Sequence, residues 1–330
     1  MFRCGSLLRS LPRSRPLSRP LSRQAQCRFY RAGPRPRYQR FQSASNIFTR
    51  WAARPTFYRE VAVMSGTAGG FYLYNLEEVP VSGRRRFNII GPDLEVSLAQ
   101  GTMEEIKLEF QGKFLPEWDP RVRQVHRVMD RLLPFAQKAG LENVNWEIHV
   151  IDNPQANAFV IPGGKVFVFT GILPLCKNED GIAAVLSHEI AHVVAHHTAE
   201  KMSQAPLVMA GALLLWTFDL SFYTSKTLMD LFMSLPGSRR QESEADYIGL
   251  LMMAEGCYSP EAAMEFWARM EHAEQGAQPP QLLSTHPAHH NRQEKIREWL
   301  PKAHEKQELS DCQGMASYCK CSSRTFIQPA

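Results

Sequence analysis

The feature that most constrains this chain is an H-E-x-x-H pattern at residues 188–192, within a segment that predicts a helix. Residues four apart lie on one face of a helix, so His188 and His192 can bind a single metal ion. Glu189 would then lie beside that ion, where its carboxylate can take a proton from an attacking water molecule. The pattern therefore predicts zinc protease chemistry.

The segment from Asn178 to Lys201 has the features of a capped and buried helix. Asn178 can cap the first turn, and Glu179 and Asp180 place negative charge where the helix dipole favours it. Histidines and a glutamate inside a buried helix need polar partners, because unpartnered polar groups in a core are costly. Apolar residues occur on almost every side of the helix, which predicts that burial: Ile182, Val185, Leu186, Ile190, Val193 and Val194.

The third metal ligand is expected from a second helix, predicted over residues 238–253. A catalytic zinc ion takes three protein ligands and leaves one position open for water. Glu242 and Asp246 are four apart, so Glu242 can bind the ion while Asp246 accepts the free ring N–H of a ligand histidine. Glu244 is rotated by about 200° from Glu242 and is expected to face elsewhere. The site would hold one Zn²⁺ per subunit.

A different class of zinc proteases takes its third ligand from the extended pattern H-E-x-x-H-x-x-G-x-x-H. Here Ala195 and Thr198 occupy the glycine and final histidine positions, which excludes that class. His196 and His197 fall near these positions but out of register. His196 could line the cleft, although a polar residue near a helix end is the simpler interpretation.

The remaining pattern predicts an α+β fold, mainly helical, of the zincin type, with a small sheet or hairpin beside the metal helix. The helices and strands outside the metal site are expected at residues 119–139, 146–151, 158–161, 166–170, 259–270 and 291–300, with short strand-like pieces over 86–112.

The hairpin formed by residues 158–161 and 166–170 turns at a Pro-Gly-Gly sequence. An exposed edge of this hairpin could bind an extended peptide as an added strand, although an ordinary core hairpin explains the pattern equally well. The residues proposed to bind substrate in this way are Val166, Phe167, Val168 and Phe169.

The amino-terminal segment has an unusual charge. Residues 1–59 contain 14 arginines, no lysine and no acidic residue. Residues 1–54, rich in Arg, Ser and Pro, are typical of a mitochondrial presequence, although a disordered basic tail has a similar composition. Because the overall net charge is +5, the remainder carries −9, so the basic pI does not indicate nucleic-acid binding.

Two segments could contact the lipid bilayer. Residues 55–76 are interpreted as a membrane anchor, although the uncharged core is shorter than the roughly 20 residues of a typical span and a buried soluble helix is the alternative. The metallopeptidase domain is expected over 77–305. Within it, residues 206–235 form a hydrophobic insertion that could touch the membrane or pack as a buried helix pair.

A polar tail with three cysteines is expected over 306–330. Cys257 and Cys312 are hypothesised to form a redox pair, because the intermembrane space permits disulfides. Cys319 or Cys321 could replace Cys312, and free thiols are the alternative interpretation.

Several motifs occur in an order that resembles one protease family: Asn157-Ala158-Phe159, Pro162-Gly163-Gly164, the H-E-x-x-H helix, and Glu242 followed by Ala245-Asp246. This order is similar to the gluzincin family, which includes the CAAX prenyl proteases and the bacterial heat-shock protease HtpX. Within that family, residues 146–150, 245–250 and 284–288 most resemble the Oma-type mitochondrial inner-membrane metalloendopeptidases.

The resemblance implies an ATP-independent zinc metalloendopeptidase of the mitochondrial inner membrane. It implies protein substrates in or near that membrane, a role in quality control and the stress response, and a homo-oligomer. It also makes His286 and Arg292 candidates to donate to the oxyanion that develops during peptide hydrolysis, with an ordinary loop histidine and a surface arginine as the alternative interpretation.

Two alternatives stay open. One is a CAAX-type prenyl protease of another membrane. The other is a non-proteolytic, zinc-containing membrane scaffold, but a structural zinc site usually has four protein ligands and no poised base, whereas Glu189 is present here.

Overall fold

The computed structural model describes residues 49–206, 236–274, 280–286, 291–310 and 312. The chain divides into two units, Met1–Trp51 and Ala52–Ala330, and the second contains every element discussed below. Most of the predicted presequence (1–54), of the 206–235 insertion and of the 306–330 tail lies outside the described residues.

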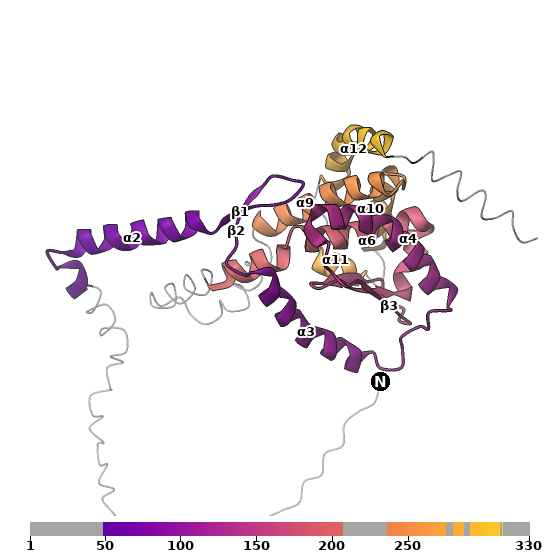
Figure 1. The fold of residues 1–330 in the computed structure, drawn as a ribbon, viewed down its shortest axis with the longest axis horizontal. Helices are drawn as coiled ribbons and strands as arrows, with labels where there is room; N and C mark the ends of the chain where they lie inside the picture. The colour runs from indigo at the N-terminus through magenta and orange to yellow at the C-terminus, as the bar shows by residue number, and fades with distance from the viewer. Residues whose placement is uncertain (1–48, 207–235, 275–279, 287–290, 311, 313–330) are drawn as a thin grey trace, which may run out of the picture. The chain divides into compact units, whose positions relative to one another are not determined.

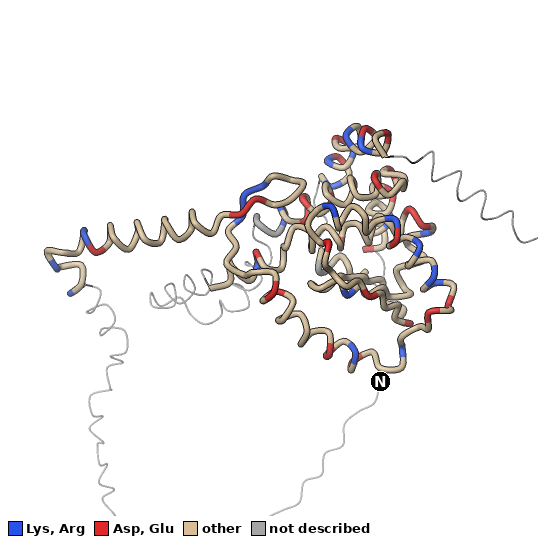
Figure 2. Tube along the Cα trace, viewed as in Figure 1, with Lys and Arg blue, Asp and Glu red and all other residues tan. Residues whose placement is uncertain are grey.

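The second unit begins with helix α2 (Phe57–Tyr74), which coincides with the predicted membrane anchor and has no buried residue. Its sequence carries no charge after Glu60 (Figure 2). Among the helices of the described residues, none combines the length and the apolar character needed to cross a membrane. A short antiparallel hairpin follows, formed by β1 (Leu76–Glu78) and β2 (Arg85–Phe87).

The expectation of strand-like pieces over 86–112 is correct only for β2, because most of this segment forms helix α3 (Pro92–Glu109). Pro92 occupies the first turn, where its missing N–H is not needed. The side chains of Ala99, Met103 and Ile106 follow at helical spacing and pack on the sheet described next.

The central sheet has three strands in the order β3 (Glu147–Ile151), β5 (Lys165–Phe169) and β4 (Ala158–Ile161). Strand β5 is parallel to β3 and antiparallel to β4. Successive residues of β5 face opposite sides of the sheet, as the period of two requires. Val166 and Val168 belong to the main core, whereas Phe167 and Phe169 pack with α3.

This topology corrects the interpretation of Val166–Phe169 as the edge that binds substrate. Because β5 pairs with a strand on each side, its backbone donors and acceptors are already used within the sheet. The edge strand of the hairpin is β4, which also packs against the metal helix. The hairpin was predicted correctly; its position inside the sheet was not.

Helices cover the face of the sheet that lies opposite α3 (Figure 1). The remaining elements are α4 (Pro120–Ala136), a π-helical turn (Gln137–Leu141), a 3-10 turn (Thr170–Ile172), α5 (Leu173–Cys176), α6 (Glu179–Val194), α9 (Pro236–Glu255), α10 (Glu261–Glu274), α11 (Gln281–Thr285) and α12 (Arg292–Leu309). Helix α6 packs against α4, α9, α10 and β4, so it forms the centre of the core. The predicted α+β, mainly helical fold is confirmed.

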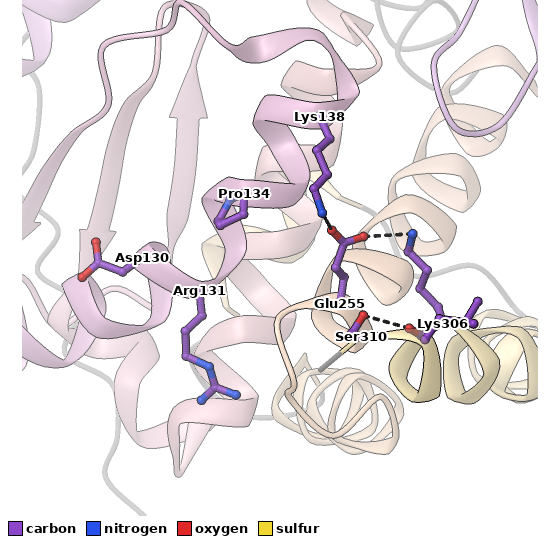
Figure 3. A pocket seen from close by; sticks show the side chains of 8 residues that line it. Asp130, Arg131, Pro134, Lys138, Glu255, Lys306 and Ser310 are labelled. Atoms are coloured by element: carbon purple, nitrogen blue, oxygen red, sulfur yellow. Dashed lines mark hydrogen bonds and ion pairs between the residues drawn. The ribbon is translucent and has the colours of Figure 1, made fainter. Parts of the chain in front are cut away.

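The carboxyl-terminal helix α12 is fastened to the end of α9. A disulfide joins Cys257 to Cys312 across 55 residues of sequence. Beside the disulfide, the carboxylate of Glu255 forms ion pairs with Nζ of Lys138 at 2.5 Å and with Nζ of Lys306 at 2.9 Å, as Figure 3 shows. These contacts tie the π-helical turn after α4 to α9 and α12.

Candidate metal centre

The metal helix α6 begins as predicted. The side chain of Asn178 accepts a hydrogen bond from the backbone N–H of Gly181 at 3.0 Å, and Glu179 and Asp180 occupy the first turn. Most of its residues are buried, including His188 and Glu189, which are 2% and 4% exposed. The helix therefore carries ionisable side chains through the middle of a core.

Helix α9 can approach α6 closely because Gly249 has no side chain. A Cβ at position 249 would lie 3.0 Å from the amide nitrogen of His188 and 3.1 Å from the carbonyl oxygen of Ser187. Both are backbone atoms that cannot rotate away. This contact brings Glu242, on α9, within reach of the two histidines of α6.

Three predicted ligands meet at one point. The Nε2 atoms of His188 and His192 are 3.2 Å apart, and Glu242 oxygens lie 3.4 Å and 3.6 Å from these two nitrogens. One potential ligand atom from each residue lies within 4.8 Å of all the others, in a group that also includes His286. Imidazole nitrogen and carboxylate oxygen are ligands that suit Zn²⁺, so the donor set fits the predicted ion.

His286 lies closer to the ligands than its predicted role requires. Its Nδ1 atom is 3.0 Å from Glu242, and its Nε2 atom is 3.4 Å from Glu189. In this arrangement His286 can be a fourth ligand, at the position that was expected to be open for water. The structure thus places His286 at the reaction centre but in contact with the ligand set.

Glu189 has the environment of a general base. Its Oε1 atom is buried without a hydrogen-bond partner among the described residues. Burial raises the pKa of this carboxyl above its usual range, and the nearby His286 and His188 oppose that shift. A carboxylate in such a dry environment accepts a proton more readily than one in water.

Asp246 takes the predicted position behind His188. Its Oδ1 atom lies 2.9 Å from His188 Nδ1, which leaves the Nε2 atom facing the ligand cluster. Burial alone would lower the pKa of His188, but the hydrogen bonds to Asp246 and Glu242 raise it to about 9 for the protein groups alone.

Arg292, which was predicted to donate to the oxyanion, lies behind the ligand histidine His188. Its guanidinium hydrogen bonds to Asp246 at 2.5 Å and lies 3.2 Å from the centre of the Trp267 ring. One terminal nitrogen therefore holds Asp246 and one face covers Trp267, whereas Nε and Nη1 have no hydrogen-bond partner among the described residues. Donation by Arg292 to the oxyanion stays a prediction, and the contact that the structure shows is the one with Asp246.

His197 and Glu244 form a pair of polar side chains behind His192 that was not expected from the sequence. His197 contacts His192 between their Nδ1 atoms at 2.8 Å, and its Nε2 atom lies 3.0 Å from Glu244. Glu244 faces away from Glu242, as predicted, but it is buried and also binds Arg84. A buried histidine five residues beyond the H-E-x-x-H pattern was the signal that could have indicated this group.

The remaining predicted residues lie apart from the cluster. Val166, Phe167, Val168 and Phe169 are buried in the central strand. Cys257 and Cys312 are bonded to each other at the far end of α9 from Glu242.

A buried H-E-x-x-H helix that receives a carboxylate from a second helix, within this α+β fold, defines a metallopeptidase of the zincin type. The profile of peptidase family M48 matches residues 120–300. The chain is 46% identical over 253 residues to the mitochondrial metalloendopeptidase OMA1 of Schizosaccharomyces pombe, covering 76% of this chain and 74% of that protein. This chain belongs to peptidase family M48 and, within it, to the Oma-type metalloendopeptidases.

Two further relatives agree. The OMA1 mitochondrial metalloendopeptidase of Saccharomyces cerevisiae is 38% identical over 310 residues, covering 89% of this chain and 90% of that protein. The OMA1 metalloendopeptidase of Homo sapiens is 34% identical over 278 residues, covering 78% of this chain and 53% of that protein. The predicted location at the mitochondrial inner membrane is confirmed by this membership.

Proposed function

We propose that this protein is a zinc-dependent, ATP-independent endopeptidase that cleaves proteins in or near the mitochondrial inner membrane. We further propose that it serves membrane quality control and the stress response and acts as a homo-oligomer. The observation that carries the proposal is the meeting of His188, His192 and Glu242 beside the buried carboxylate of Glu189. The relatives named above support mitochondrial proteolysis over a prenyl protease of another membrane or an inactive scaffold.

The metal would be held by His188, His192 and Glu242. When bound, Zn²⁺ supplies Lewis acidity that polarises the scissile carbonyl. Glu189 removes a proton from the attacking water and later delivers it to the leaving amine. Asp246 holds the Nδ1–H of His188, which keeps its Nε2 lone pair available for the ion, and Arg292 holds Asp246.

His286 must leave the ligand cluster for substrate to enter. Its Nε2 atom lies 3.4 Å from Glu189, so a small rotation keeps it near the reacting carbonyl. In that position it can donate to the developing oxyanion. It directly follows the five-residue helix α11, as its C-cap residue.

The substrate strand is proposed to add to β4. Phe169 donates its N–H to the carbonyl oxygen of Asn157, and Ala158 is paired with Val168. Because backbone groups alternate in an antiparallel ladder, those of Ala158 and Val160 face the outer edge, beside the metal helix. An extended peptide could bind there.

Contact with the membrane is assigned to α2, which exposes Val63, Leu73 and Phe71 among other apolar residues.

The Cys257–Cys312 disulfide is proposed to respond to the redox state of its compartment. Peptide mapping without reductant tests this disulfide, because complete alkylation of both cysteines in the native protein would contradict it.

The function is tested with Glu189→Gln in the full chain. The amide cannot accept a proton, so cleavage of a casein-like substrate should fall at least about 100-fold. Zinc content should stay unchanged, because Glu189 is not a ligand. Cleavage at the native rate by this variant would contradict the proposed mechanism.

A further inference from the structure

The hairpin that precedes the family-matched region reaches the back of the metal centre. Arg84, in the loop between β1 and β2, binds Glu244 through Nε at 2.8 Å and Glu200 through its two terminal nitrogens at 2.9 Å and 2.6 Å. Ser82 donates a further hydrogen bond to Glu244. These contacts join a segment outside residues 120–300 to buried carboxylates on two helices.

The hydrogen bonds beyond Glu244 have a single consistent direction. The carboxylate of Glu244 only accepts, so Nε2 of His197 must carry the proton that fills their 3.0 Å contact. The Nδ1 atom of a neutral His197 is then an acceptor. It must receive the Nδ1–H of His192 across their 2.8 Å contact. This leaves the lone pair of His192 on Nε2, the atom that faces His188 and Glu242.

The same hairpin region holds the turn that carries His197. The buried Arg86 donates to the carbonyl oxygen of Ala195 at the end of α6. Glu95, at the start of α3, lies 2.7 Å from His196 Nδ1 and accepts the N–H of Ala199 at 3.3 Å. Residues on both sides of His197 are therefore held by β2 and by the first turn of α3.

We propose that His197 is a positioning residue for the metal ligand His192, and that the β1–β2 hairpin fixes His197 through Arg84 and Glu244. Asp246 binds Nδ1 of His188 directly, whereas Glu244 acts on Nδ1 of His192 through His197. Each of the two ligand histidines thus has its tautomer set by a carboxylate on α9. Since α2 leads directly into the hairpin, a force on α2 would reach the metal ligand by this route.

The test compares three substitutions of one residue in the full chain. His197→Gln can accept from His192 and donate to Glu244, His197→Asn is too short to make both contacts, and His197→Leu makes neither. The readouts are zinc affinity by competition with a chromophoric chelator, and kcat and KM separately. We expect His197→Leu and His197→Asn to weaken zinc binding about 10–100-fold and to lower kcat with little change in KM, and His197→Gln to recover most of both.

Arg84→Met tests the hairpin. Arg127→Met is the control, because among the described residues Arg127 pairs only with Glu179, at the exposed start of α6. Zinc affinity should fall several-fold in the first and stay unchanged in the second. If His197→Leu does not fold, as judged by circular dichroism, the comparison of His197→Gln with His197→Asn decides. Equal, native zinc affinity in all folded His197 variants overturns the proposal.

The inference rests on the proposed ligand set, and His192→Ala separates the two. Loss of zinc from His192→Ala together with native affinity in His197→Asn overturns only the positioning role. Retention of native zinc affinity by His192→Ala overturns the ligand set itself, and the positioning role with it.

Discussion

Gly249 of α9 lies against the backbone of His188 of α6, where a Cβ would be 3.0 Å from the amide nitrogen of His188. The two helices that supply the metal ligands therefore pack so closely at this point that only glycine fits between their backbones. This contact ties the packing of the core to the geometry of the metal centre.

Gly249→Val should separate α6 from α9, because the new side chain meets backbone atoms that cannot yield. Overpacking of this kind destabilises a protein by about 1–3 kcal/mol, and the displaced Glu242 should weaken zinc binding as well. Thermal unfolding and chelator competition measure the two effects. Gly101→Val in α3 is the matched control, since a Cβ there meets nothing within 4 Å. Equal effects of the two substitutions would show that the close contact has no role.

The proposed substrate edge can be tested with proline, which removes one backbone donor. Val160→Pro removes an N–H that faces outward from β4, so KM should rise at least about tenfold while the sheet is kept. Phe159→Pro removes an N–H that points toward β5 and should instead lower the melting temperature. Native KM for Val160→Pro would exclude β4 as the strand that binds substrate.

The pH dependence of stability should carry a contribution from Glu244. Burial raises its pKa, but the hydrogen bonds from His197, Arg84 and Ser82 outweigh burial and lower the pKa from its usual 4.5 to about 2. Because the unfolded chain binds this proton more tightly, the stabilisation is complete above about pH 4.5 and is lost as the pH falls toward about 2.

Thermal melts of the wild type and Glu244→Gln should therefore differ most near neutral pH and converge in acid. The glutamine carries no charge to protonate, so its melting temperature should fall less steeply over this range. A constant difference between the two proteins down to about pH 2 would mean that Glu244 does not titrate as described.

The ligands could be predicted from sequence because each depends on local spacing. His188 and His192 share one face of a helix, as do Glu242 and Asp246, and periodicity alone brings each pair to one side. The meeting of the two helices was inferred from chemistry, since a catalytic zinc ion needs a third protein ligand. The metallopeptidase class followed from these two steps.

The errors concern contacts between distant parts of the chain. The place of β5 between two strands depends on its parallel pairing with β3, which no local pattern indicates. Helix α3 was missed because its few buried apolar residues are interrupted by Gly101 and by polar positions. The role of Glu244 depends on Arg84, which lies 160 residues away in the sequence.

The most direct measurement is the zinc content of Glu242→Ala after dialysis against a chelator, beside the wild type and Glu265→Ala. Glu265 lies on the exposed side of α10 and pairs only with Arg269 among the described residues. We expect one zinc ion per chain in the wild type and in Glu265→Ala, and a large loss in Glu242→Ala, because α9 supplies the carboxylate that completes the ligand set. A full complement of zinc in Glu242→Ala would contradict the metal centre described here.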